Sequence, residues 1–264
     1  MNNRIISLQE IYKTSYEYLV SILPAELKEN DLHKYFLGDR RDYDCLNDVF
    51  EQIIASAQNY RSMPKTIQFY KRYDAIKRIL YDFDYKAVKL LSVDELTNLF
   101  RAEFNIKTPD SKYNSWRKWS RSIIEIAEFV NEFKDVDDFR AFVNHFSYNK
   151  QTRIALPLLI STKIYGIGFA LACDSLKELG YTEYPKPDVH LMEVFSEIGL
   201  SKKDPIDTFE AIVKMAEECG ETPYKVDKVF WLICSGEFYL DEFKIPRYKD
   251  SLIAKLKSIY NYDT

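Results

Sequence analysis

Glycine and proline are scarce in this chain, which has seven glycines and nine prolines among 264 residues. Because both residues mark turns, their scarcity argues against a turn-rich β fold and favours long helices with short connections. Hydrophobic residues make up 46% of the chain, which is enough for a sizeable core and too many for a disordered protein. The length allows one large domain or two small ones.

Cysteine is also rare, and the four cysteines, Cys45, Cys173, Cys219 and Cys234, are widely spaced. No Cys-x-x-Cys pair occurs, which argues against a zinc ribbon or finger. The first residues do not resemble a secretory leader, so we expect reduced thiols in the cytoplasm. The abundance of Lys, Asn, Ile and Tyr is compatible with an AT-rich bacterial genome.

A long unbroken apolar run is lacking as well. The segment Ile154–Cys173 is apolar enough to resemble a membrane span, but Pro157, Lys163 and two glycines interrupt it. Spanning requires a single unbroken apolar helix. We therefore expect a broken, buried helix pair and no membrane partner.

The net charge of −4 argues mildly against a nucleic-acid-binding protein, but the charges are unevenly distributed. The region 61–121 contains 14 Lys or Arg and 7 Asp or Glu, a local balance of +7. Such a basic region on an acidic chain suits contact with a phosphate backbone. Solvated helix faces explain the same charges equally well.

Apolar residues recur at helical spacing through most of the chain. Ser92 and Glu95 form a capping-box pattern, and the segment Thr66–Asp82 is basic and tyrosine-rich. We find no repeat and no useful alternating strand pattern, so the predicted fold class is all-α. The predicted helices are Leu8–Leu23, Asp44–Ala57, Asp94–Phe104, Ser115–Phe133, Asp137–Phe146, Ala155–Lys163, Phe169–Leu179, His190–Ile198, Pro205–Cys219, Pro223–Ser235 and Tyr248–Tyr260.

Two of the few glycines, Gly166 and Gly168, flank a single residue between two predicted helices. Such a pair lets the chain turn sharply and exposes backbone N–H groups. The following helix presents its unpaired donors and positive dipole end to the same place, where an anion such as a DNA phosphate fits. A close crossing of the two helices would also explain the glycines.

Asp188 follows Pro187, so the chain approaches it in an extended conformation, and a helix is expected from His190 onward. Asp188 therefore lies at or near a helix N-cap, and capping alone could explain it. The functional alternative is a carboxylate that faces a cleft and acts on a reacting sugar.

Together these segments resemble the signature of the helix-hairpin-helix DNA glycosylase superfamily, most of all its endonuclease III-like branch. Residues 164–168, Ile-Tyr-Gly-Ile-Gly, are similar to the family's Leu-Pro-Gly-Val-Gly hairpin, and Asp188-Val189-His190 matches its Asp-x-His at compatible spacing. Residues 54–58, Ile-Ala-Ser-Ala-Gln, resemble the family's Leu-Leu-Ser-Ala-Gln. A weaker match is residues 226–232, which resemble a late core helix of the family. The resemblance covers roughly residues 45–235.

The resemblance implies two helical lobes with the helix-hairpin-helix motif and an active-site cleft between them. One lobe would be 45–189 and the other 1–44 with 190–264. Asp188 would be the catalytic carboxylate, which stabilises the developing oxocarbenium charge and orients or deprotonates water. The residues that would contact DNA are Gly166, Gly168, Gln58, Asn59, Tyr60, Tyr165 and His190. Of these, Gln58, Asn59 and Tyr60 would fill the gap left by a flipped nucleotide, and His190 would help to position the aspartate loop.

The departures from the family pattern change the expected chemistry. Bifunctional members carry a lysine two residues beyond the second hairpin glycine, where this chain has Ala170. Without that amine no Schiff base forms there, so the resemblance implies hydrolysis without strand cleavage. A displaced lysine, Lys163 or Lys186, would restore a bifunctional glycosylase/lyase. Tyr165 replaces the usual hairpin proline.

No cofactor is expected, because the family's four-cysteine iron–sulfur loop is missing. The resemblance also allows a structural K+ or Na+ at the hairpin, held by carbonyls of Ile164 and Gly166, and no metal held by side chains.

A flipped base needs flat stacking partners, and the chain has 20 Tyr, 17 Phe and 3 Trp. We predict a base pocket from Tyr113, Trp116 and Trp119, with Tyr60 and Tyr165 as further candidates. Trp116 and Trp119 are three positions apart on an apolar helix face, so core packing is the alternative for both.

The predicted function is therefore a monofunctional DNA glycosylase of base excision repair. Its partner would be double-stranded DNA with a lesion or mismatch, and the protein would be a monomer associated with the bacterial nucleoid. One alternative is a helix-hairpin-helix protein that binds DNA without catalysis. Another is a helical scaffold for a protein partner, which leaves the spacing of the glycines and Asp188 unexplained.

Overall fold

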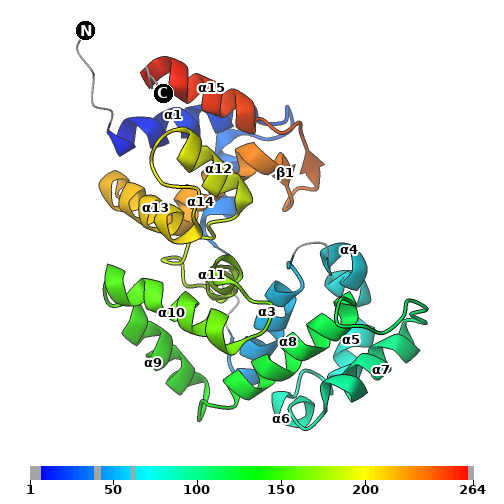
Figure 1. Cartoon of the computed structure of the whole chain (residues 1–264). Coiled ribbons are helices and arrows are strands. Elements are labelled where there is room, and N and C mark those ends of the chain that lie inside the picture. The colour runs from blue at the N-terminus through cyan, green and yellow to red at the C-terminus, as the bar shows by residue number, and fades with distance from the viewer. Residues whose placement is uncertain (1–6, 39–42, 61–62, 261–264) are drawn as a thin grey trace. The chain divides into compact units, whose positions relative to one another are not determined.

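The structure is a computed structural model that describes residues 7–38, 43–60 and 63–260. Nearly all of its regular structure is helical (Figure 1). The strands Glu237–Phe238 (β1) and Phe243–Lys244 (β2) form a short antiparallel pair, with Glu237 opposite Lys244. The all-α prediction is confirmed. No helix in these ranges is long and apolar enough to cross a membrane.

The chain divides into two compact units: a terminal unit of residues 1–40 with 180–264, and a central unit of residues 41–179. The predicted boundary at residue 189 is therefore wrong, because the loop 181–187 and Asp188 belong to the terminal unit. Hydrogen bonds explain why. Tyr224 N–H donates to the Thr182 carbonyl at 3.0 Å, and Lys186 N–H donates to the Asp227 carboxylate at 2.8 Å. The predicted cleft between lobes stays a prediction.

The central unit packs around α8 (Ser115–Val130), which contacts α3, α4, α6 and α7. Trp119, Ile123, Ile126 and Val130 on one face of α8 are completely buried, as their helical spacing predicts. The other elements of this unit are α3 (Leu46–Ala57), α4 (Met63–Ile67), η2 (Phe69–Arg72), α5 (Tyr73–Ile79), α6 (Tyr85–Val88), α7 (Val93–Glu103), α9 (Val136–Ser147), α10 (Lys150–Lys163) and α11 (Phe169–Glu178).

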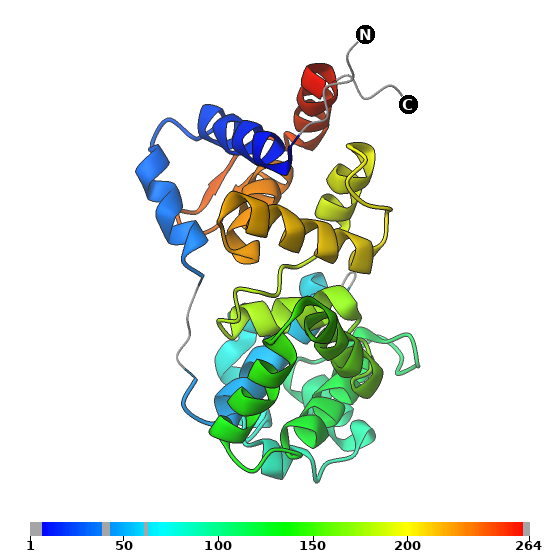
Figure 2. The same ribbon diagram turned by 90° about the vertical axis from the view of Figure 1, so that its left-hand side faces the viewer.

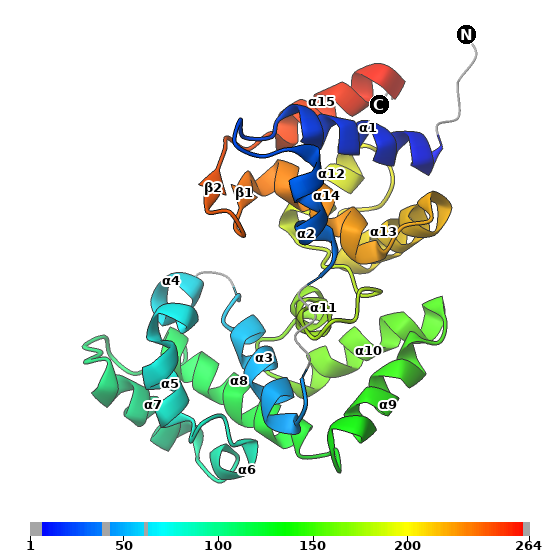
Figure 3. The same ribbon diagram turned by 180° about the vertical axis from the view of Figure 1, so that it is seen from behind.

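The terminal unit has a separate core, in which α1 (Leu8–Ser21) packs against α13 (Pro205–Cys219), α14 (Pro223–Ser235) and α15 (Lys249–Tyr260). Figures 2 and 3 show these helices from two further sides. Ile11, Leu19, Phe195 and Phe230 are among its buried residues. The remaining elements are η1 (Glu29–Leu32), α2 (His33–Phe36) and α12 (Val189–Glu197), besides β1 and β2.

Local capping explains where the helices begin and end. The predicted capping box at Ser92 and Glu95 is present at the start of α7, where each side chain bonds the other's backbone N–H. Helix α10 begins earlier than the predicted Ala155, because the Asn149 side chain accepts the Thr152 N–H at 2.9 Å and caps the helix there. Pro157 therefore lies inside α10.

Candidate functional site

Helices α10 and α11 are joined by the glycine turn, residues 164–168, as the sequence predicts. Gly166 has φ +79°, a left-handed conformation that side-chain-bearing residues rarely adopt. A Cβ atom at this position would lie only 3.2 Å from the Ser122 hydroxyl oxygen. The turn itself therefore requires glycine at position 166.

Gly168 differs from Gly166 in both respects. Its backbone is extended, with φ −85° and ψ 175°, and it is the exposed N-cap of α11. A Cβ atom there would have no neighbour within 4 Å. Neither the backbone conformation nor packing within the described residues requires a glycine here. Close approach of a ligand to the backbone is a remaining physical reason for one.

The turn also presents unpaired donors. Among the described residues, the backbone N–H groups of Gly166, Gly168 and Ala170 donate to no protein acceptor. Those of Gly168 and Ala170 lie at the N-terminal end of α11, where the helix dipole is positive. This arrangement can bind an anion.

Helix α8 fixes the turn through side chains that sequence analysis did not single out. The Ser122 hydroxyl donates to the Tyr165 carbonyl at 2.7 Å, and the Glu125 carboxylate accepts the Tyr165 N–H. The Arg121 guanidinium lies 4.2 Å from the centre of the Tyr165 ring and pairs with Glu125 at 2.8 Å. The peptide groups and ring of Tyr165 are thus held by side chains of α8.

Asp188 is the N-cap of α12, so the capping interpretation is correct as a local description. Its Oδ1 accepts the N–H groups of His190 and Leu191 at 2.9 and 3.1 Å. Its Oδ2 accepts no hydrogen bond from any described residue. Burial, and then the negative charge of Asp227, raise the pKa of the half-buried Asp188 carboxyl. The cap therefore orients one oxygen and leaves the other available.

The bifunctional alternative, with Lys163 or Lys186 as a displaced lysine, stays a prediction. Lys163 Nζ bonds both carboxylate oxygens of Glu132, at 2.6 and 2.8 Å. The Lys186 backbone, two residues before Asp188, bonds Asp227, and its side chain is half-buried. Ala170 lies in the first turn of α11.

Gln58 is buried, whereas a side chain that enters DNA must be exposed. It is 5% exposed, and its Oε1 accepts the Phe69 N–H at 3.1 Å. That N–H needs a partner because Gln68, just before it, is left-handed and caps η2 without a side-chain bond. Asn59 is exposed, with its amide 3.5 Å from the Asp174 carboxylate, and Tyr60 is half-buried.

The predicted base pocket is wrong for two of its three residues. Trp116 and Trp119 are 3% and 0% exposed and pack against Phe100 in the core of the central unit. Their spacing therefore reflects core packing, which was the alternative prediction for both residues. Tyr113 is instead 73% exposed, with Lys112 Nζ 5.2 Å from its ring centre.

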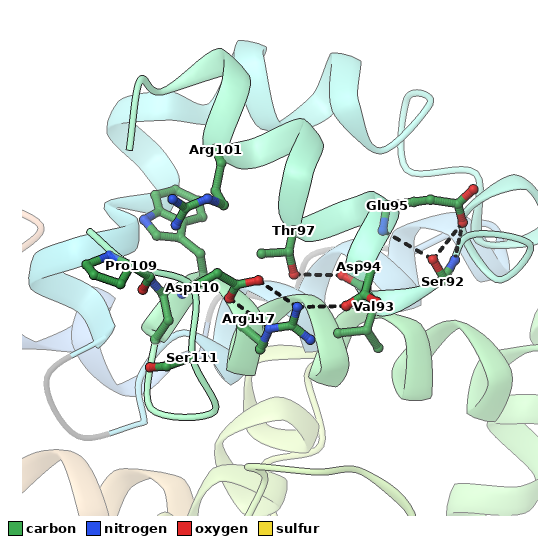
Figure 4. Close-up of polar contacts among 12 residues, drawn as sticks. Ser92, Val93, Asp94, Glu95, Thr97, Arg101, Pro109, Asp110, Ser111 and Arg117 are labelled. Carbon is green, nitrogen blue, oxygen red and sulfur yellow. Dashed lines mark hydrogen bonds and ion pairs between the residues drawn. The ribbon is translucent and has the colours of Figure 1, made fainter. Parts of the chain in front are cut away.

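The loop that carries Tyr113 is held by a cluster of polar contacts (Figure 4). The Arg117 guanidinium bonds both carboxylate oxygens of Asp110, at 2.8 and 2.6 Å, and also bonds Asp94 at 2.7 Å. Arg101 donates to the Thr108 carbonyl at 2.7 Å. Arg117 lowers the pKa of the Asp110 carboxyl. These contacts fix the loop between α7 and α8.

The basic region is partly neutralised within the protein. Arg78, Arg117 and Arg121 form ion pairs with acidic side chains. Arg61, its first residue, lies outside the described residues. Five exposed lysines of the region form no ion pair with a described residue: Lys65, Lys71, Lys86, Lys107 and Lys112.

The predicted cation at the turn stays a prediction. The Ile164 carbonyl accepts the Ile167 N–H at 3.3 Å and keeps one lone pair, and the Gly166 carbonyl accepts no bond from the described residues. Within those residues, no three or more His, Cys, Asp or Glu side chains are grouped to hold a metal.

No protein-family model, curated protein or solved structure matches this chain.

Proposed function

We propose that the protein is a monofunctional DNA glycosylase, which flips a damaged or mispaired base and hydrolyses its N-glycosidic bond. The observation that carries the proposal is that the two carboxylate oxygens of Asp188 differ in their hydrogen bonds. One oxygen is fixed by two backbone N–H groups, and the other is unpartnered within the described residues. A helix cap needs only the first oxygen.

The glycine turn supports the choice of DNA as the substrate. In the proposal, the N–H groups of Gly168 and Ala170 bind a backbone phosphate of DNA. The absence of a side chain at Gly168, which the fold does not require, lets the phosphate approach. The unpaired lysines of the central unit add a favourable field for a polyanion.

The proposed reaction breaks the bond between C1′ of deoxyribose and the base nitrogen, and its electron pair leaves with the base. The Asp188 carboxylate stabilises the positive charge that develops on the sugar. Water then adds to C1′, and its proton passes to Asp188 Oδ2. Because position 170 is an alanine, no amine attacks C1′ from there, and the sugar–phosphate backbone stays intact.

The test uses duplexes that each carry one lesion or mismatch, incubated with the protein and then split into samples with and without alkali. Breaks that require alkali indicate base excision alone, which is the expected result. Breaks without alkali that are trapped by borohydride would show a lyase and contradict the role of Ala170.

Asp188→Asn is the decisive variant, because asparagine caps a helix about as well as aspartate. We expect it to lower excision by about 10²- to 10⁴-fold and to leave DNA affinity unchanged. Asp204→Asn is its matched control, since Asp204 Oδ1 caps α13 with bonds of 2.8 and 3.1 Å in the same unit. Undiminished excision by Asp188→Asn would remove Asp188 from the mechanism.

A DNA-binding protein without catalysis is the second candidate, because capping accounts for the hydrogen bonds that Asp188 makes. It predicts tight binding to duplex DNA with no product on any lesion. In that case Gly168→Ala weakens DNA binding, and Asp188→Asn changes nothing.

A further inference from the structure

A second carboxylate, Asp227, lies in the buried part of the terminal unit next to Asp188. Asp227 belongs to α14 and is only 1% exposed. Burying a carboxylate is costly unless hydrogen bonds or charges compensate. Since α14 could bury an apolar residue at this position, the carboxylate calls for a physical reason.

The hydrogen bonds of Asp227 lead directly to the Asp188 loop. Its Oδ2 accepts the Lys186 N–H at 2.8 Å, and the carbonyl of the same Lys186 accepts the Asp188 N–H at 2.8 Å. The neighbouring Pro185 and Pro187 are buried and have no N–H of their own. The Lys186 N–H is therefore the only backbone N–H in residues 185–187, and Asp227 accepts it.

We propose that Asp227 is a positioning residue for Asp188, which it controls through the Lys186 peptide group and through its own negative charge. The inference rests on the proposed function insofar as it concerns catalysis. Through the peptide group, Asp227 sets where the Asp188 carboxylate lies. Through its charge, it makes the Asp188 carboxylate a better acceptor for the proton of the attacking water.

Other groups around Asp188 also raise or lower the pKa of its carboxyl. Lys186 and His190 favour its charged form, as does the Leu191 N–H, whereas burial and Asp227 oppose it. The Cys234 thiol is also close, because burial and then the charge of Asp188 raise its pKa to about 12. Cys234 is therefore neutral at physiological pH and adds no charge to the site.

Two substitutions separate the two effects. In Asp227→Asn the side-chain oxygen still accepts the Lys186 N–H but the charge is lost. In Asp227→Ala both are lost, so the Lys186 N–H no longer has the Asp227 carboxylate as its acceptor. We expect the Asp188 carboxyl, followed by carbon-13 NMR against an Asp188→Asn reference, to titrate at lower pH in Asp227→Asn than in the wild type.

Excision assays give the second readout. In Asp227→Asn the acidic limb of the pH–rate profile should move to lower pH with the NMR titration, while KM stays unchanged. In Asp227→Ala excision should fall about 100-fold over the whole pH range, because a displaced carboxylate is misaligned. Asp204→Asn, which removes another capping carboxylate of the same unit, should change neither readout.

The two measurements distinguish a failure of this inference from a failure of the proposed function. The NMR titration needs no substrate, so it tests the coupling even if the wild-type protein excises no base. An unchanged Asp188 titration in Asp227→Asn would overturn the role of the charge. Full excision activity in a folded Asp227→Ala protein would overturn the role of the Lys186 peptide group.

Discussion

Replacing each glycine of the turn by alanine should change stability in opposite directions. In Gly166→Ala the new residue must adopt φ +79°, which costs about 1–2 kcal/mol. Its methyl group would also lie 3.2 Å from the Ser122 oxygen. If that hydroxyl moves away, its bond to the Tyr165 carbonyl is lost, at about 1 kcal/mol.

In Gly168→Ala the backbone conformation is open to any residue and the methyl group meets no atom within 4 Å. Alanine restricts the unfolded chain more than glycine does, so this variant should gain about 0.4–1 kcal/mol. With about 2–4 °C per kcal/mol for a unit of this size, Tm should fall by roughly 2–12 °C in Gly166→Ala. It should rise by about 1–4 °C in Gly168→Ala.

Thermal unfolding followed by circular dichroism measures both Tm values. A fluorescence-anisotropy titration with a labelled duplex then measures DNA affinity. Gly168→Ala should bind DNA at least about tenfold more weakly in spite of its higher Tm, because the methyl group prevents a charge-assisted hydrogen bond. A lower Tm for Gly168→Ala, or an unchanged one for Gly166→Ala, would refute the geometric reasoning. Unchanged DNA affinity in Gly168→Ala would refute the phosphate site alone.

Three further predictions concern single side chains. Because the pKa of Asp188 is raised in the folded state, ionisation of its carboxyl destabilises that state. The stabilisation that the protonated carboxyl contributes to the folded state is fully present below about pH 4, the pKa in the unfolded chain, and is lost as pH rises through the folded pKa. Urea unfolding from pH 4 to 7 should therefore show the wild type losing stability relative to Asp188→Asn, and parallel curves would contradict this. Gln58→Ala should destabilise the protein by about 1–3 kcal/mol because the Phe69 N–H loses its acceptor, and an unchanged urea midpoint would argue against this structural role. Arg117→Lys, which loses the two-pronged contact with Asp110, should speed amide hydrogen exchange in residues 105–114; exchange at the wild-type rate would show that other contacts fix the loop.

The helices of this chain could be predicted where both ends carry a strong local signal. Helices α13 and α14 have the predicted bounds because proline at the first position and glycine just after the last mark each one. Helix α10 begins at Lys150, five residues before the predicted Ala155. The signal that could have found it is Asn149 three residues before Thr152, a pair in which each side chain bonds the other's backbone.

The candidate site was predictable only where it depends on short-range sequence. The conformation of the glycine turn and the capping position of Asp188 follow from neighbouring residues. The burial of Gln58 depends on an N–H group eleven residues later, and the contact of Asp227 with Lys186 joins residues 41 positions apart. Residue type and helical spacing carry no information about such partners, so both were missed.

The terminal unit is made from two separated stretches of chain, which has a consequence during synthesis. Helix α1 is translated early, but its packing partners α13, α14 and α15 begin only at Pro205, Pro223 and Lys249. At 5–20 residues per second a ribosome needs roughly 10–40 s to cover the intervening chain. During that time Ile11, Tyr12 and Leu19 have no core to enter, whereas the central unit, which ends at residue 179, is fully synthesised before α13 begins. The nascent chain therefore exposes the apolar face of α1 until these helices are made, and a chaperone that binds such faces would find its target in α1.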